Sequence, residues 1–313
     1  MRVFKATLRY WLRIARYHLR GAWTARIPRV LLEPLAVAGW RSGSVFKPRI
    51  LAQGVARAEI GREVLGVSPA QARRARSVDR LESLIDQRIY FGRRARRSEV
   101  WPDLQAVAAR LAHEISRLKA KWPERPVIVS PFHYVSQYAN IYVVDELRAL
   151  LGIESMAVVS GVPRNIYGDD DAQIPGLKVL YTFGDGDVER NQLGLRVARA
   201  LKRHGVAVLF SDVPPFAFQR FPMQTVDVSM FGRHARIHNG VFRLGARLDA
   251  MLLPFYLRFE NGRFDAELLS PLSLAAAEAP QQLAQHIETA LIRNYSSWLP
   301  AGHPSMYAFA SVK

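Results

Sequence analysis

Cysteine is missing from this chain of 313 residues. Its absence excludes disulfides, iron–sulfur clusters, zinc sites held by thiolates and any cysteine nucleophile. Long hydrophobic runs are missing as well. The longest uncharged segment, residues 126–144, contains proline, histidine, glutamine and asparagine, so it is not expected to span a membrane. The first apolar residues alternate with arginine, so we expect no signal peptide and a folded protein that is soluble or peripherally bound.

The motifs of several large enzyme classes are also missing. The sequence has no Walker A lysine loop, no G-x-G-x-x-G, no G-x-S-x-G and no H-E-x-x-H. Residues 184–187 resemble a fragment of a calcium loop without its later ligands, so we expect a turn there. Three consecutive aspartates at residues 169–171 offer carboxylates for a divalent cation, but an exposed acidic loop is the favoured interpretation. The sequence therefore predicts no metal site.

Positive charge is concentrated in one part of the chain. Residues 1–125 carry 27 Lys and Arg against 10 Asp and Glu, whereas residues 126–313 carry 17 of each. The net charge of +17 thus belongs to the N-terminal part, which indicates two regions with different partners. We divide the chain into a basic helical region, residues 1–120, and an α/β domain, residues 121–313. A basic region attracts phospholipid head groups, nucleic acid or an acidic protein.

Residues 1–20 are expected to form an amphipathic helix. A basic stripe beside a wide apolar arc with tryptophan is typical of a helix in a membrane interface, and the alternative is a helix docked on the domain. Residues 30–40 are a candidate second apolar contact, and the arginine run at 93–97 is a solvated segment or a docking site. The apolar arc and the lack of a binding motif argue against nucleic acid. The stripe consists of Arg2, Arg9, Arg13, Arg16 and Arg20, and the arc of Phe4, Leu8, Trp11, Leu12, Ala15 and Leu19.

From about residue 126 short apolar runs alternate with amphipathic segments. The apolar runs predict strands at residues 126–130, 155–160, 206–210, 251–257 and 264–269. The amphipathic segments predict helices at residues 139–152, 189–204, 239–248 and 280–298, preceded by helical patterns at 78–85 and 107–118. Strands that alternate with helices indicate an α/β fold in which helices cover a mostly parallel mixed sheet.

Polar side chains follow two of these predicted strands. His133 comes just after the first strand, and Asp212 comes just after the strand at residues 206–210. In α/β sheets, ligands bind beyond the carboxyl ends of the strands. His133 is the best candidate for a general base, because histidine titrates near neutral pH. The alternative is that His133 only satisfies a local hydrogen bond.

Several segments after residue 126 carry a family resemblance through their order and spacing. They are Pro131-Phe-His133, Pro163-Arg164-Asn165, the helix, glycine and strand that lead to Asp212, Met230-Phe-Gly-Arg233, Leu253-Pro-Phe255 with Arg258, and the closing Asn294-Tyr-Ser-Ser-Trp298. Over residues 127–298 the chain resembles the lysophospholipid acyltransferase superfamily, and in particular its lipid A biosynthesis (lauroyl/myristoyl) acyltransferase branch.

The resemblance implies transfer of an acyl chain from a thioester donor to a hydroxyl or an amine. The donor would be acyl-CoA or acyl carrier protein, with no resident cofactor, and His133 would remove the proton of the acceptor. Arg164, Asn165, Arg233 and Arg258 are candidate contacts for an anionic donor or head group, or else structural ion-pair partners. The resemblance also implies peripheral association with the cytoplasmic side of the cell membrane, or a cytoplasmic enzyme.

One position departs from the family pattern. The family places Asp or Glu five residues after its histidine, and Tyr138 stands there in this chain. Either another carboxylate, Asp212 or Asp145, reaches His133 from elsewhere, or Gln137 or Tyr138 orients it for an easier acceptor. The third alternative is a catalytically inactive member that binds acyl chains or acts as a scaffold. Val213 also replaces the Gln that follows the family's aspartate, which puts the usual role of that corner in doubt.

Overall fold

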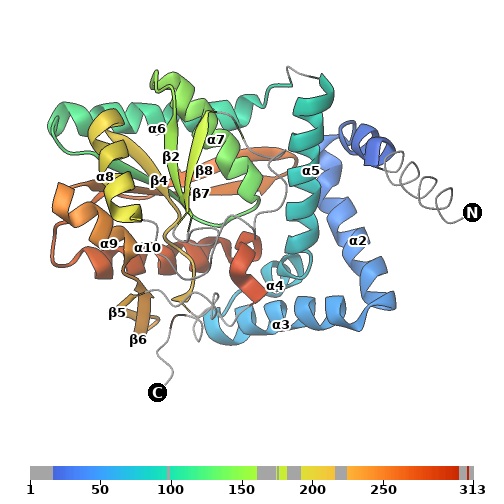
Figure 1. The fold of residues 1–313 in the computed structure, drawn as a ribbon. Helices are drawn as coiled ribbons and strands as arrows, with labels where there is room; N and C mark the ends of the chain where they lie inside the picture. The colour runs from blue at the N-terminus through green and yellow to red at the C-terminus, as the bar shows by residue number, and fades with distance from the viewer. Residues whose placement is uncertain are drawn as a thin grey trace, which may run out of the picture.

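The computed structural model of the chain describes residues 17–96, 99–160, 174, 176–181, 192–215, 224–302 and 309. Residues 17–24 are helical, whereas residues 1–16 of the expected amphipathic helix lie outside the described part. The helices that precede the sheet are α2 (Leu32–Phe46), α3 (Pro48–Leu65), α4 (Pro69–Ala75), α5 (Val78–Arg96) and α6 (Pro102–Lys121). Figure 1 shows α2, α3 and α5 as a helical layer at one side of the molecule.

Local sequence signals explain where these helices begin and end. Helices α3, α4 and α6 each begin with a proline, namely Pro48, Pro69 and Pro102. Proline has no backbone N–H, and the N–H groups of the first turn have no partner within the helix, so no hydrogen bond is lost there. Ser68 and the Gln71 side chain form a reciprocal capping box at the start of α4. The α3 helix ends at Gly66, which adopts a left-handed conformation with φ of 63°.

Within the described part, seven strands form one mixed sheet with the order β3-β2-β4-β1-β7-β8, and β9 pairs with β7. The β1–β4, β1–β7, β2–β3 and β2–β4 pairs are parallel, and β8 and β9 run antiparallel to β7. The predicted α/β class and mostly parallel mixed sheet are confirmed. The strands are β1 (Val127–Pro131), β2 (Met156–Ser160), β3 (Leu177–Tyr181), β4 (Val206–Leu209), β7 (Met251–Glu260), β8 (Arg263–Leu268) and β9 (Leu272–Ser273).

Helices cover the sheet, as the alternating pattern predicts. They include α6 together with α7 (Gln137–Leu150), α8 (Leu193–His204), α9 (Gly240–Gly245) and α10 (Ala279–Asn294). The last helix stops at Asn294 rather than at Trp298, and a short 3-10 turn at Tyr295–Ser297 follows it. Trp298 is extended and forms an antiparallel bridge with Tyr134.

A two-stranded hairpin was not predicted from the sequence. Its strands are β5 (Thr225–Met230) and β6 (Arg233–His238), and it lies against α10. The Met230-Phe-Gly-Arg233 segment of the family resemblance is thus the hairpin turn, where Phe231 and Gly232 both have positive φ. Positive φ at both central residues is typical of the type I′ turn that suits a hairpin.

The basic N-terminal helices and the sheet share one hydrophobic core. Trp101 is fully buried, and its ring meets that of Phe264 on β8 at 5.6 Å. Arg88 on α5 forms a buried bidentate ion pair with Glu99, with nitrogen–oxygen distances of 2.6 and 2.7 Å. The described helices include none that is both long and apolar enough to cross a bilayer.

Candidate active site

The candidate site lies at the carboxyl ends of β1 and β4. These two strands are parallel neighbours, so the residues that follow them meet at the same edge of the sheet. The hydroxyls of Ser130 and Ser211 lie 2.6 Å apart and link the two strand ends. His133 and Asp212 follow these serines, and the structure brings them together.

Asp212 holds the His133 ring and its backbone at once. His133 Nδ1 lies 2.6 Å from Asp212 Oδ1, and the backbone N–H of His133 donates to Oδ2 at 2.7 Å. A carboxylate at that distance fixes the proton on Nδ1, so Nε2 carries the lone pair. The described residues provide no hydrogen-bond partner for Nε2, and the side chain is 17% exposed. The basic nitrogen is therefore free to accept a proton from a substrate.

Asp212 is fully buried, and a buried carboxylate requires partners. A third donor completes its shell, because Trp298 Nε1 donates to Oδ2 at 3.0 Å. Two donors therefore meet at Oδ2 and one at Oδ1, and all three stabilise negative charge. Trp298 comes from the segment after α10, far from Asp212 in the sequence, and sequence reasoning did not assign it to the site.

The loop that carries His133 is held rigidly. Val135 has φ of 66°, a conformation that a β-branched residue rarely adopts and that the surroundings must enforce. Its N–H donates to Ser297 O at 2.8 Å, and Leu299 N donates to the carbonyl of His133 at 2.8 Å. Asn140 Nδ2 also reaches three carbonyls of the loop, the nearest at 3.0 Å. Such positioning is typical of catalytic side chains.

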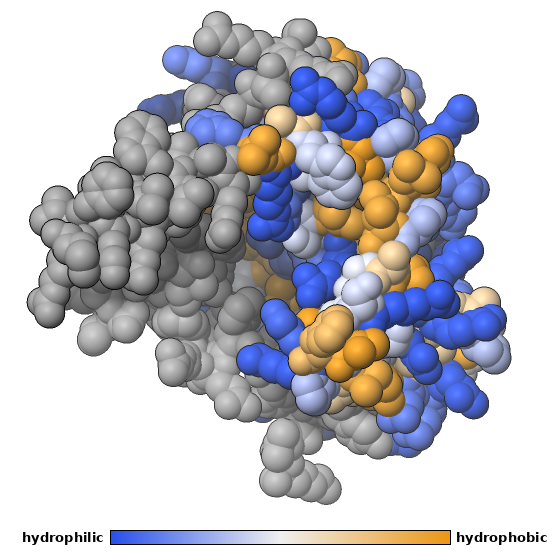
Figure 2. Space-filling view, turned by 90° about the vertical axis from the view of Figure 1, so that its right-hand side faces the viewer, coloured by the Kyte–Doolittle hydropathy of each residue, from blue (hydrophilic) through white to orange (hydrophobic). Residues whose placement is uncertain are grey.

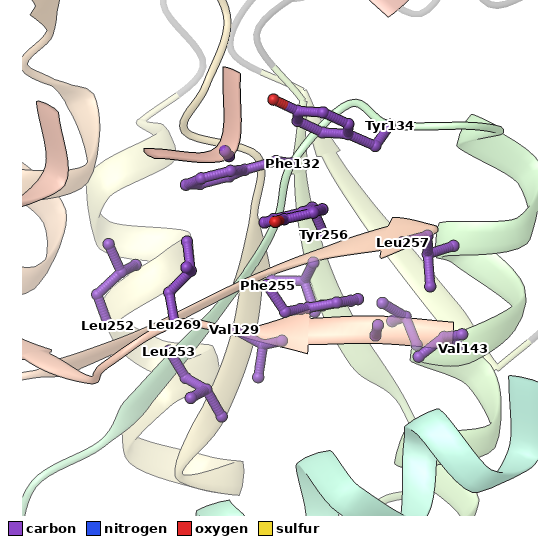
Figure 3. Close-up of a cluster of buried hydrophobic side chains, with 14 of the residues drawn as sticks. Val129, Phe132, Tyr134, Val143, Leu252, Leu253, Phe255, Tyr256, Leu257 and Leu269 are labelled. Atoms are coloured by element: carbon purple, nitrogen blue, oxygen red, sulfur yellow. The ribbon is translucent and has the colours of Figure 1, made fainter. Parts of the chain in front are cut away.

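One aromatic ring lies beside the candidate base, and others pack in the core near the end of β1. The Phe210 ring lies 4.6 Å from the His133 ring, centroid to centroid. In Figure 3 the rings of Phe132, Tyr134 and Tyr256 lie close together beyond the end of β1, and the last two are 4.9 Å apart. Burial, with Asp212 nearby, raises the pKa of Tyr134 well above its usual range, so its hydroxyl stays protonated.

The other candidates for orienting His133 lie elsewhere. Tyr138 packs its ring edge-on against Tyr90, with centroids 6.2 Å apart. Asp145 pairs with Arg148 at 3.0 Å and with Arg93 at 3.5 Å. Gln137 is the first residue of α7. Of the two carboxylates considered as partners of His133, Asp212 is therefore the one that contacts it, although Tyr138 stands at the position of the family's acid.

The candidate anion contacts are not brought together with His133. Arg233 is exposed at the hairpin turn, and Arg258 lies on β7, opposite Asp265 on β8. Neither makes a hydrogen bond or an ion pair with His133. Arg164, Asn165 and the acidic stretches at 169–171 and 184–187 lie outside the described residues. Within the part of the chain that the structure describes, no group of three or more His, Asp or Glu side chains is arranged to hold a metal ion.

Two buried carboxyl groups lie beside the start of α7. Asp86 on α5 accepts a hydrogen bond from Ser136 Oγ at 2.5 Å, and Ser136 caps α7 by accepting the N–H of Ala139 at 2.8 Å. Burial raises the pKa of Asp86 to about 6. Burial, together with the neighbouring carboxylates of Asp86 and Asp79, raises the pKa of Glu82 to about 8. No motif in the sequence singles out either carboxyl group.

Glu82 is expected to make stability depend on pH. The pKa is higher in the folded protein than the ordinary 4.5, so the folded state keeps a proton that the unfolded chain loses first. The contribution of Glu82 to stability is fully present below about pH 4.5 and is lost as the pH rises through about 8. At about 1.4 kcal/mol per pKa unit, the loss has an upper limit of about 5 kcal/mol.

Replacement Glu82→Gln should therefore stabilise the protein at about pH 9 and have little effect at about pH 4.5. Urea unfolding at both pH values measures this difference. Glu63→Gln, an exposed position on α3, serves as the control and should show no pH-dependent difference. A Glu82→Gln effect that is equal at both pH values would contradict a raised pKa.

The arrangement has a definite chemical capacity. A histidine with a buried carboxylate on one ring nitrogen and an unpaired second nitrogen can act as a general base, and the carboxylate stabilises the imidazolium that forms. Neither the protein-family models nor the curated proteins include a match to this chain. The function is therefore inferred from the site and the order of the sequence segments.

Proposed function

We propose that the protein is an acyltransferase that moves an acyl chain from a thioester donor to a hydroxyl or an amine. The observation that carries this proposal is the contact between His133 and Asp212, with 2.6 Å between Nδ1 and Oδ1. Through this contact Asp212 provides the carboxylate partner that the family pattern would place at position 138. A catalytically inactive scaffold would have no need of a basic nitrogen held in this way.

In the proposed reaction His133 Nε2 accepts the proton of the attacking hydroxyl or amine. The acceptor atom bonds to the thioester carbonyl carbon, whose oxygen takes up the negative charge. When the carbonyl re-forms, the carbon–sulfur bond breaks and the thiolate takes the proton back from His133. Asp212 stabilises the imidazolium between the two proton transfers. No bond between enzyme and acyl chain forms, and the enzyme leaves the cycle unchanged.

The order of segments supports the family assignment within this proposal. The loop with His133 after β1, the corner with Asp212 after β4 and the closing Trp298 stand in the order that the resemblance implies, and all three meet at the site. The donor would be acyl-CoA or acyl carrier protein, with no resident cofactor. Arg164, Asn165, Arg233 and Arg258 remain proposed contacts for an anionic group.

The proposed place of action is the cytoplasmic side of the cell membrane, with peripheral attachment. The charge of the N-terminal part supports it, because a basic surface is attracted to anionic lipids. The amphipathic pattern of residues 1–20 adds an apolar face that can enter the interface. An acyl acceptor that is itself a lipid would then be within reach.

Thioester consumption tests the proposal. The wild-type protein is incubated with acyl-CoA or acyl carrier protein donors and with pooled lipid and amine acceptors, and release of free thiol is followed. The expected result is thiol release that depends on an acceptor, above the rate of hydrolysis without one. No release with any donor, together with measurable binding of acyl chains by the folded protein, would instead support the inactive, acyl-binding alternative.

A further inference from the structure

The corner between α2 and α3 exposes large apolar side chains. Val45 and Phe46, the last two residues of α2, are 77% and 82% exposed. No other large apolar side chain in the described part is as exposed. Pro48, Leu51 and Ala52, at the start of α3, are exposed as well and continue the patch around the corner. In Figure 1 this corner lies at the edge of the helical layer, away from the sheet.

The apolar patch extends along α2. Leu31, Pro34, Ala38 and Val45 are separated by three, four and seven residues, so they share one face of the helix, and all four are exposed. The space-filling view of this side of the molecule shows apolar side chains interspersed with hydrophilic ones (Figure 2). We call the exposed apolar side chains of residues 31–52 the α2–α3 patch.

The charged residues of the α2–α3 patch that follow Glu33 are all basic. Between Glu33 and Glu59 the chain has no acidic residue. The exposed side chains of Arg41, Lys47 and Arg49 lie among the apolar ones. Apolar side chains interleaved with Lys and Arg suit the boundary between acyl chains and anionic head groups.

The corner is firmly packed, so its exposure is not the fraying of a helix end. The Trp40 ring lies directly on Gly54, where a Cβ atom would come within 2.5 Å of the indole nitrogen. A Cβ atom on Gly43 would likewise come within 3.2 Å of the Ile50 side chain. The two glycines thus let α2 and α3 approach closely, and the closely packed helices hold Val45 and Phe46 outward.

We propose that the α2–α3 patch is a membrane-docking surface that inserts Val45 and Phe46 into the interface of a bilayer containing anionic lipids. A protruding corner fits a deformable lipid surface, and interleaved basic residues match its head groups. The proposal rests on the peripheral attachment proposed above, but not on acyl transfer. It assigns an attachment surface to the helices α2 and α3, in addition to the amphipathic pattern of residues 1–20.

The helices that carry the α2–α3 patch also contact the segment that holds the loop of His133. The α3 helix packs against residues 299–302, and the Tyr295 hydroxyl donates to Arg57 O on α3 at 2.9 Å. Leu299 in turn donates its N–H to His133 O. The helical layer that carries the α2–α3 patch is thus linked to the loop of His133 through residues 295–302.

Vesicle binding by the full chain tests the proposal. Co-sedimentation is measured with vesicles of phosphatidylcholine alone and of phosphatidylcholine mixed with phosphatidylglycerol. The double variant Val45→Glu/Phe46→Glu should weaken binding to the mixed vesicles at least about tenfold. Lys47→Glu/Arg49→Glu should weaken binding to the mixed vesicles by about tenfold and leave binding to phosphatidylcholine unchanged.

A matched control and two contrary outcomes make the test decisive. Leu150→Glu/Ile292→Glu adds the same charge at two exposed apolar positions on α7 and α10 and should bind vesicles as the wild type does. Unchanged vesicle binding by Val45→Glu/Phe46→Glu would overturn the proposal. A wild-type dimer that this variant converts to a monomer would overturn it too and make the patch an interface between two copies. Thiol release with water-soluble substrates, measured in parallel, reports acyl transfer separately and should stay unchanged.

Discussion

Replacement His133→Ala should reduce acceptor-dependent thiol release by about 10²- to 10⁴-fold, the range that general-base catalysis supplies. Asp212 holds the His133 ring through Nδ1, and among the described residues Nε2 has no hydrogen-bond partner, so it can accept a proton. Without it, a hydroxyl or amine must lose its proton to water during attack. The measurement is the steady-state rate of thiol release at saturating donor and acceptor.

The alanine variant also removes a donor from the buried Asp212 carboxylate. Two donors remain, the His133 backbone N–H and Trp298 Nε1, so the fold should survive. His133→Asn provides a second test, because its amide can still donate to Asp212 but cannot act as a base. His113→Ala, at an exposed position on α6, is the control and should keep the wild-type rate. Near-normal turnover in both His133 variants would rule out His133 as the base.

The sequence predicts the central part of the fold well. The buried strands β1, β4 and β7 are short apolar runs, and the helices that cover them show the expected periodicity. The hairpin of β5 and β6 was missed because its strands carry charged and polar residues and its turn places Phe231 at positive φ. The edge strand β3 is short and has Lys178 as its second residue, so it lacks the continuous apolar run that predicts a buried strand.

From the sequence, the site can be predicted only where the topology of the sheet determines which residues meet. Parallel strand ends meet at one edge, which brings His133 near Asp212 without knowledge of side-chain packing. Trp298 could not be found in this way, because its contact depends on how the chain after α10 folds back over the strand ends. The pKa values of Glu82 and Asp86 are likewise raised mainly by burial, which depends on how α5 packs in the folded chain.

Replacement Asp212→Asn should reduce kcat by about 10³- to 10⁴-fold and change KM little. The reason lies in the three donors around the carboxylate. The His133 backbone N–H and Trp298 Nε1 both point at Oδ2, so the asparagine oxygen must take that position. Its NH₂ group then faces His133 Nδ1 and forces the imidazole proton onto Nε2. The nitrogen that faces the substrate loses its lone pair, and the positive charge that develops on the ring loses its partner.

Two control variants separate this role from a general loss of charge. Asp145→Asn removes a carboxylate that, among the described residues, forms ion pairs only with arginines. Tyr138→Phe removes the hydroxyl at the position where the family has its acidic residue. Both should keep turnover within a few-fold of the wild type. If Tyr138→Phe lost as much activity as Asp212→Asn, the tyrosine would share in orienting the base. If Asp212→Asn kept full activity, the contact between Asp212 and His133 would be structural, because a base with the wrong tautomer cannot take the proton of an acceptor.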